Sequence, residues 1–173
     1  MERRLPPFAP YENAMLTADW AMAHSLLSVP LTWGCCIPLD VVRAADGEVS
    51  IASVEGVVRQ VLGWREDVWQ LYWRFGRGYP RGNVLRAHAP LSDWWRELDA
   101  DAVTARCLRT ARLDPPHPLV MVLGNHALQR GCQPREHSVW FREAFVDGFA
   151  RVMPPNVIGM SQHADGGMMA KKP

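Results

Sequence analysis

Apolar positions recur at helical spacing along most of the chain, in segments that proline and glycine separate. Few stretches alternate apolar and polar residues as a half-buried strand would, so the pattern predicts a mainly α-helical protein. The first ten residues lack such a period and are expected to be irregular. Helices are predicted over 12–27, 38–45, 54–73, from 99 or 101 to 112, 119–130 and 134–153.

Single residues predict where several of these helices begin and end. Ser53 is the expected N-cap of the third helix, because a serine side chain accepts a hydrogen bond from a backbone N–H in the first turn. Pro30 is expected to end or kink the first helix, since proline lacks a donor. Gly131 should stop the fifth helix. Pro134 should be the first residue of the last helix. The two prolines at 154–155 should end this helix.

Two segments are predicted to be loops. Residues 75–89 contain three glycines and a proline and are typical of a long surface loop. Residues 156–173 are glycine-rich and irregular, with no capping or packing element that would close a domain. We therefore expect a chain whose C-terminus is truncated.

Composition indicates one globular domain that can bury a core, with 173 residues, 48% hydrophobic and 21% charged. The net charge is +1, and acids and bases are interspersed, so no charged block indicates nucleic acid or a membrane surface. Any contact with DNA must therefore be local. No apolar run follows the basic first residues, so no signal peptide is expected, and no stretch has membrane-spanning length. A cytoplasmic location is therefore expected.

Familiar catalytic and metal motifs are missing from the sequence. The four cysteines have no paired CxxC spacing and are expected to be free, buried thiols. The six histidines show no metal or triad spacing and are interpreted as surface or hydrogen-bonded core residues. The absence of a Walker loop, a dinucleotide fingerprint and a Ser-His-Asp pattern argues against several large enzyme classes.

Three stretches remain as candidates for function. In residues 24–28, the hydroxyls of Ser25 and Ser28 could bind phosphate at a helix end, or could simply cap it. Residues 63–73 hold three tryptophans, a tyrosine and an arginine. They could form a surface that stacks a planar ring or transfers an electron. Alternatively, they form a core helix with one salt bridge. Residues 156–167 place polar side chains beside glycines that permit close approach to a ligand.

Four sequence motifs resemble those of a known family: PYENAM from Pro10, HSLLSVPLTWG from His24, SVEGVVRQVLGWRE from Ser53, and NVIGMSQHADGGMMAKKP from Asn156. In this order they resemble the deoxyribodipyrimidine photolyase-related family, which comprises iron–sulfur bacterial cryptochromes and (6-4) photolyases. The resemblance covers nearly the whole chain. It implies that residues 1–173 are an internal part of the FAD-binding helical domain, and that the ancestral activity is light-driven, FAD-dependent repair of pyrimidine photoproducts in damaged DNA.

The resemblance also implies a set of site residues. The 24–28 stretch is similar to the loop that contacts the flavin diphosphate, Asn156 matches the residue that faces flavin N5, and Trp64 falls in the helix that lines the lesion and flavin cavity. The cofactor-binding residues that follow are Tyr11, His24, Ser25, Leu27, Ser28, Arg65, Asn156, Gln162 and Asp165.

An electron-transfer path is part of the same expectation. Trp140 matches a family tryptophan near the flavin, and its neighbour, usually tyrosine, is Phe141 here. Trp94 or Trp95 lies near a second expected tryptophan. Trp64, Trp140 and His117 are therefore the expected catalytic residues.

Departures from the family pattern predict loss of activity. Family members begin with an α/β antenna domain and end with a cysteine-rich segment, and neither is found here. Cys107 matches one iron–sulfur ligand, but a four-iron cluster needs about four thiolates, so no cluster is expected. Between Cys107 and Val120 the chain is shorter by about two helical turns. His117 is the one candidate left for the histidines beside the lesion, and the prolines around it would not permit the same helix.

Two interpretations follow from these departures. The favoured one is an incomplete, inactive photolyase or cryptochrome homologue that binds flavin weakly or not at all. The alternative is a non-catalytic helical binding or scaffold domain that has lost FAD. In both cases the exposed apolar surface is expected to favour self-association.

Overall fold

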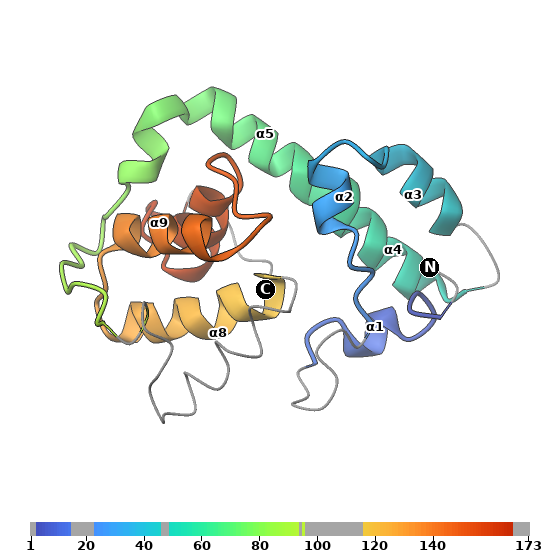
Figure 1. Cartoon of the computed structure of the whole chain (residues 1–173), viewed down its shortest axis with the longest axis horizontal. Coiled ribbons are helices and arrows are strands. Elements are labelled where there is room, and N and C mark those ends of the chain that lie inside the picture. The colour runs from blue at the N-terminus through green and yellow to red at the C-terminus, as the bar shows by residue number, and fades with distance from the viewer. Residues whose placement is uncertain (1–2, 15–22, 46–48, 94, 96–115, 168–173) are drawn as a thin grey trace. The chain divides into compact units, whose positions relative to one another are not determined.

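A computed structural model of the chain describes residues 3–14, 23–45, 49–93, 95 and 116–167 (Figure 1). The chain divides into two compact units, residues 1–67 and 68–173, and each is considered by itself. The described residues are predominantly helical, and among them β pairing is limited to one isolated parallel bridge between Ala89 and Cys132. The predicted mainly α fold class is confirmed.

The described residues form a series of helical elements. Those of the N-terminal half are α1 (Phe8–Tyr11), α2 (Ser28–Thr32), α3 (Pro38–Ala45), α4 (Ile51–Val58), the π-helical segment η1 (Arg59–Gly63), α5 (Trp64–Phe75) and the 3-10 segment η2 (Gly76–Arg81). Those of the C-terminal half are α8 (Pro116–Gln129), α9 (Pro134–Ala144) and the π-helical segment η3 (Pro155–Ser161). The predicted helix that ends near 112 lies outside the described residues.

In the N-terminal unit, α1 and α3 pack against α4. The buried apolar side chains of this unit are Leu5, Phe8, Ala23, Leu31, Val41, Ala45, Val57 and Val61. The approach of α1 to α4 is so close that a Cβ on Gly56 would lie 2.8 Å from the Phe8 ring. A larger residue at 56 would therefore displace α1.

Ser53 does not cap the helix that begins in this unit, so that prediction is wrong. The N-cap is Ser50, whose hydroxyl accepts a hydrogen bond from the Ser53 backbone N–H, and α4 begins at Ile51. The Ser53 hydroxyl is buried, accepts from the Ala9 N–H at 3.1 Å and donates to the Pro6 carbonyl at 3.1 Å. The Ser53 side chain therefore fixes the N-terminal segment. This segment was expected to be irregular, but part of it forms the short helix α1.

Pro30 does not end a helix either. It lies inside α2, in the first turn, where a missing N–H costs no intrahelical hydrogen bond. Most of the helix predicted over 12–27 falls on residues that are not described. Its described parts, 12–14 and 23–27, are not helical, and Leu26 has a φ of +59°.

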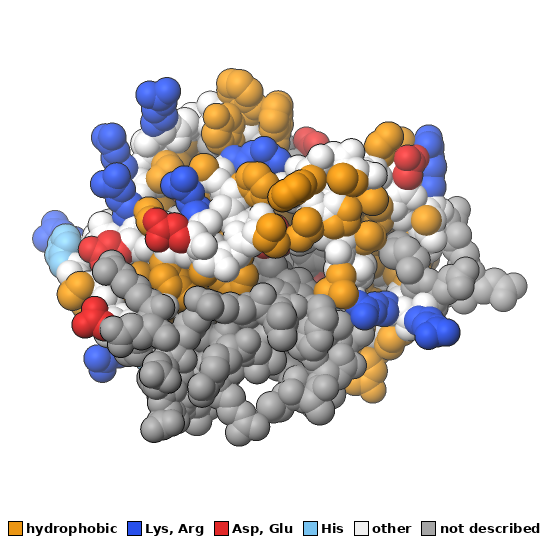
Figure 2. Space-filling view, viewed as in Figure 1, with side chains coloured by type: hydrophobic (Ala, Val, Ile, Leu, Met, Phe, Trp, Pro, Cys, Tyr) orange, Lys and Arg blue, Asp and Glu red, His pale blue; other side chains and the backbone are white. Residues whose placement is uncertain are grey.

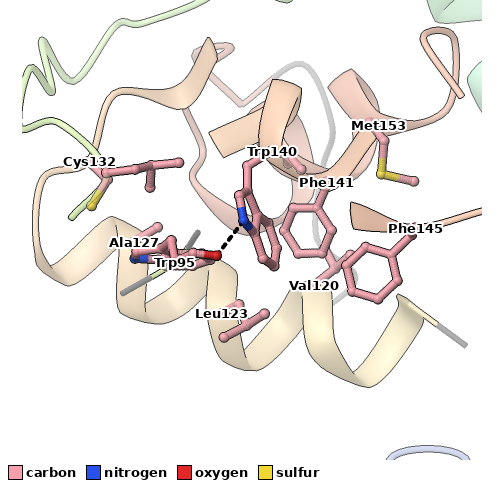
Figure 3. Packing of buried hydrophobic residues seen from close by; sticks show 11 residues of the cluster. Trp95, Val120, Leu123, Ala127, Cys132, Trp140, Phe141, Phe145 and Met153 are labelled. Carbon is pink, nitrogen blue, oxygen red and sulfur yellow. Dashed lines mark hydrogen bonds between the residues drawn. The ribbon is translucent and has the colours of Figure 1, made fainter. Parts of the chain in front are cut away.

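The second unit is built from η2, α8, α9 and η3. Helix η3 packs against both α8 and α9, while α9 also contacts η2. The buried apolar residues of this unit are Leu91, Trp95, Val120, Leu123, Ala127, Cys132, Trp140, Phe141, Phe145, Met153 and Val157 (Figure 3). Two predicted boundaries are confirmed, since Pro134 is the first residue of α9 and Gly131, with a φ of +64°, follows the end of α8.

The predicted end of the last helix is wrong. Helix α9 stops at Ala144, and Phe145 takes an extended conformation with a φ of −122°. A tight turn follows, in which a Cβ on Gly148 would lie 2.5 Å from the Phe141 carbonyl oxygen. This turn brings Phe145 into the core, and η3 then begins at Pro155 instead of a helix ending there.

Both predicted loops are partly wrong as well. Residues 156–165 lie mainly in the core, since η3 is buried between α8 and α9 and most of the following residues are buried too. Within 75–89, the first part forms η2, whose Tyr79 is buried. The remaining loop is fixed by backbone hydrogen bonds from Val84 to Ala164 and between Ala89 and residues 131–133.

Replacing Gly124 with alanine is expected to destabilise the protein through the contact between α8 and η3. A Cβ at this position would lie 2.2 Å from Cβ of Ser161, so one backbone must shift. Overpacking of this kind costs about 1–3 kcal/mol, which outweighs the helix preference of alanine over glycine, about 1 kcal/mol. Chemical denaturation measures the change.

Gly63→Ala is the matched control for this substitution. Gly63 is also helical, but it is exposed and has no atom within 4 Å of its Cβ position. A Gly124→Ala protein as stable as Gly63→Ala would contradict the packing of η3 against α8.

Candidate functional site

The expected site residues fall into two groups according to the unit that contains them. The N-terminal unit holds Tyr11, His24, Ser25, Leu27, Ser28, Trp64 and Arg65. The second unit holds Trp140, Asn156, Gln162 and Asp165. Cys107 and the side chain of His117 lie outside the described residues.

Residues 24–27 are not helical and lead directly into α2. The Ser25 hydroxyl accepts a weak hydrogen bond from the Leu27 N–H at 3.4 Å, and an Arg4 guanidinium nitrogen donates to the His24 carbonyl at 2.8 Å. Ser25 is exposed, so its own O–H can point toward a bound anion. Ser28 is the first residue of α2 and does not cap it, because the N-cap position is Leu27.

Helix α5 buries one narrow stripe and exposes its indoles. Val68 and Leu71 are buried, whereas Trp69 and Trp73 are 55% and 66% exposed. Trp64 and Arg65 are half-buried. The interpretation of this stretch as a core helix is therefore wrong for its two exposed tryptophans, and the exposed-surface interpretation fits them.

Two tryptophans pair in the core of the second unit. The indoles of Trp95 and Trp140 meet edge to face, with ring centroids 4.9 Å apart and an interplanar angle of 84°. The Trp140 Nε1–H donates to the Trp95 carbonyl at 2.7 Å, as the dashed line in Figure 3 shows. Phe141 packs on Trp140 at 5.0 Å and stacks on Phe145 at 5.4 Å. Of the two predicted partners, Trp95 makes this contact, and Trp94 is not described.

Beside this pair lies a polar contact that the sequence did not predict. Gln162 donates from Nε2 to the Cys132 carbonyl at 2.9 Å, so its Oε1 is the acceptor that lies 3.1 Å from His137 Nδ1. The proton of neutral His137 is therefore on Nδ1. The ring is fully buried, and its Nε2 has no hydrogen-bond partner. The expectation of a hydrogen-bonded core histidine is met at one ring nitrogen and fails at the other.

Burial lowers the pKa of His137 to about 4, against 6.5 for an ordinary histidine, and the hydrogen bond that the ring donates to Gln162 offsets only part of this shift. The sequence did contain a signal for this burial. His137 precedes Phe141 by one helical turn, so both occupy the same face of α9. What the sequence could not show is the pairing with Gln162, which lies 25 residues away.

Asn156 and Asp165 also make internal hydrogen bonds. The Asn156 Nδ2 group donates to the Val152 carbonyl at 2.8 Å. Asp165 accepts from the Tyr79 hydroxyl at 2.9 Å and from the Gly167 N–H at 3.0 Å. Burial and this carboxylate raise the pKa of Tyr79 well above its ordinary value, so the phenol stays protonated and remains the donor.

The described cysteines are all free, but they are not all buried. Cys35 is exposed, Cys36 is half-buried and Cys132 is buried, so the expectation of a buried thiol is wrong for Cys35. Burial raises the pKa of the Cys132 thiol. Among the described residues no three histidine, cysteine or acidic side chains come together as a metal site. The described helices include none that is long and apolar enough to cross a membrane.

Sequence comparison shows that the chain is similar to a photolyase. The chain is 34% identical over 175 residues to a (6-4) photolyase of Agrobacterium fabrum (strain C58 / ATCC 33970). The alignment covers 96% of this chain, which spans about a third (34%) of the length of that relative. No family model matches the chain.

Proposed function

We propose that the chain is a photolyase- or cryptochrome-related helical protein whose family activity is flavin-dependent, light-driven repair of DNA, and that it does not perform this repair alone. The observation that carries the proposal is the similarity to a (6-4) photolyase along 96% of the chain. The geometry adds the pair of Trp95 and Trp140, because two buried indoles in contact are suited to moving an electron through a core.

The residues present fit a flavin only in part. Ser25 offers an exposed hydroxyl to a diphosphate. Bound FAD would supply the light-absorbing redox group. On the side expected to face the ring, however, the Asn156 amide donates to Val152, and both Gln162 and Asp165 are engaged in internal hydrogen bonds. We therefore propose weak flavin binding or none, and no iron–sulfur cluster at Cys107.

A non-catalytic helical binding domain is the second candidate. The observation that favours it is the internal hydrogen bonding of Gln162, whose Oε1 and Nε2 both contact groups of the same unit. A side chain held in this way stabilises a core and is not available to a ligand without rearrangement. Self-association, expected from exposed apolar surface, gains no support from the described residues.

An absorption spectrum of the purified full chain is the first test. We expect flavin far below one molecule per chain and no iron–sulfur absorbance, also after addition of FAD before purification. A yellow protein with one FAD per chain would contradict the weak-binding proposal. Ser25→Ala and Asn156→Ala would then be the substitutions that identify the contacts, with the exposed Ser92→Ala as control.

If the chain retains flavin, Trp140→Phe is expected to slow its photoreduction by an external donor at least about tenfold, because the indole pair is broken. Trp33→Phe is the matched control, since Trp33 is 65% exposed and lies in the other unit. Photoreduction that proceeds equally fast in both variants would refute the electron-transfer role of Trp140.

A further inference from the structure

Three large aromatic side chains are exposed together on the C-terminal half of α5. Trp69, Tyr72 and Trp73 are 55%, 50% and 66% exposed. Both Trp69 and Tyr72 meet Trp73 edge to face, with centroids 5.4 Å apart. Figure 2 shows hydrophobic side chains gathered over this part of the helix, with Lys and Arg side chains over the segment that follows it. Large exposed aromatic patches of this kind mark binding sites.

The aromatic patch continues into a hollow of about 290 Å³. Tyr72 and Trp73 line one part of it, and Arg77 comes from η2. Arg151 precedes η3, and Pro155 is its first residue. Two of the lining residues are arginines and none is acidic. The hollow therefore combines aromatic faces with positive charge, and we name these residues, with Trp69, the aromatic–arginine surface.

The arginines of this surface are carried on backbone that the core holds in place. The turn from α5 into η2 passes through Gly76, whose φ of +54° few other residues adopt. Two residues after Arg77, the Tyr79 ring stacks on Phe75 at 5.9 Å, and its hydroxyl is bonded to Asp165. The Arg151 guanidinium lies 5.6 Å from the centre of the Phe149 ring. The surface is thus largely preformed, which lowers the cost of binding.

We propose that the aromatic–arginine surface binds single-stranded nucleic acid, with bases stacked on Trp73 and Tyr72 and phosphates paired with Arg77 and Arg151. Every base has a face that can stack on an indole, and guanidinium groups pair with phosphate in a planar fork. An apolar protein partner would leave the two arginines unpaired. A free mononucleotide would cover one ring and leave the others exposed, so a strand of several nucleotides fits the patch best.

This binding requires neither flavin, nor a lesion, nor light, and it is independent of the function proposed above. Its test uses the full chain and a fluorescently labelled oligothymidylate of about twelve nucleotides, followed by anisotropy at low salt. We expect single-strand binding that Trp73→Ala weakens about tenfold or more, since stacking on one aromatic side chain has an effect of that size. Arg77→Gln combined with Arg151→Gln should lower the salt slope of log K by about 1.4.

Matched controls separate this surface from general charge and aromatic effects. Trp33→Ala removes an equally exposed indole from the other unit, and Arg142→Gln removes an exposed arginine of α9. Both should bind like the unaltered chain, and circular dichroism verifies that all variants fold. The proposal is overturned if the oligonucleotide does not bind at low salt or if Trp73→Ala and Trp33→Ala bind alike. It is equally overturned if duplex DNA or a mononucleotide binds as tightly as the single strand.

Discussion

Replacing Phe141 with alanine is expected to lower the free energy of unfolding by about 3–5 kcal/mol. Phe141 is fully buried at the centre of the second unit (Figure 3). Its ring contacts His137, Trp140 and Phe145, with centroid distances of 5.0, 5.0 and 5.4 Å. Removing the ring opens a cavity beneath aromatic neighbours that are themselves fixed by packing, so the site cannot readily collapse.

Urea denaturation followed by tryptophan fluorescence measures this loss, and Val146→Ala is the control. Val146 lies five residues further along, is 66% exposed, and should change stability by less than about 0.5 kcal/mol. Phe141→Leu should fall between the two, because it leaves a smaller cavity. A Phe141→Ala protein within about 1 kcal/mol of the unaltered chain would show that this aromatic core is not formed.

Helix positions were predictable where the signal is local. Helix α3 has the predicted bounds, because a proline in the first turn and a run of helix formers leave few alternatives. Pro134 opens α9 for the same reason, with Gln133 as the N-cap that accepts from the Glu136 N–H. Gly131 ends the preceding helix because glycine adopts positive φ without a steric penalty.

The end of α9 was not predictable, because tertiary packing decides it. Phe145, Phe149 and Met153 continue the helical period of α9, so the sequence pattern runs past the point where the helix stops. The turn at Gly148 depends on contact with the Phe141 carbonyl, a detail that spacing does not reveal. The segment from Asn156 shows the same problem. Its glycine-rich composition is typical of a loop, yet it forms η3, which is buried. The glycine that permits this close packing is Gly124 of α8, because a Cβ there would lie 2.2 Å from Cβ of Ser161.

The candidate site shows the same division between local and long-range information. Trp140 is an expected site residue because of its family position, and it fits the apolar helical period of α9. Its partnership with Trp95 crosses 45 residues and needed the structure. The hydrogen bonds of Gln162, and that of Asp165 with Tyr79, cross 25–86 residues, so the sequence could not show that these polar side chains also contact the core.

His137 is expected to make the protein acid-labile over a defined pH range. Its pKa is about 4 in the folded chain and 6.5 when unperturbed, so between these values the unfolded chain binds more protons. The free energy of unfolding should therefore be unaffected by this group above about pH 6.5. It should then fall by about 1.4 kcal/mol per pH unit, to a total loss of about 3 kcal/mol near pH 4.

The physical cause of this acid sensitivity is the surroundings of the ring. Trp95 and Phe141 pack against it at 5.0 Å, and Gln162 accepts the one proton that the neutral ring donates. A second proton on Nε2 would be a buried charge without a hydrogen-bond acceptor. His126, whose pKa burial and Arg130 also lower, adds to the loss in the same direction.

Denaturation at a series of pH values between 4.5 and 7 isolates the contribution of His137 when His137→Asn is compared with the unaltered chain. Asparagine can donate to Gln162 as Nδ1 does, but it cannot take up a proton in this range. Its stability should therefore vary far less with pH, even if the smaller side chain lowers stability at pH 7. His88→Asn, at an exposed position, should keep the full pH dependence. An equally steep loss in His137→Asn would assign the acid sensitivity to other groups, because the substitution removes the titrating ring and leaves the remaining histidines in place.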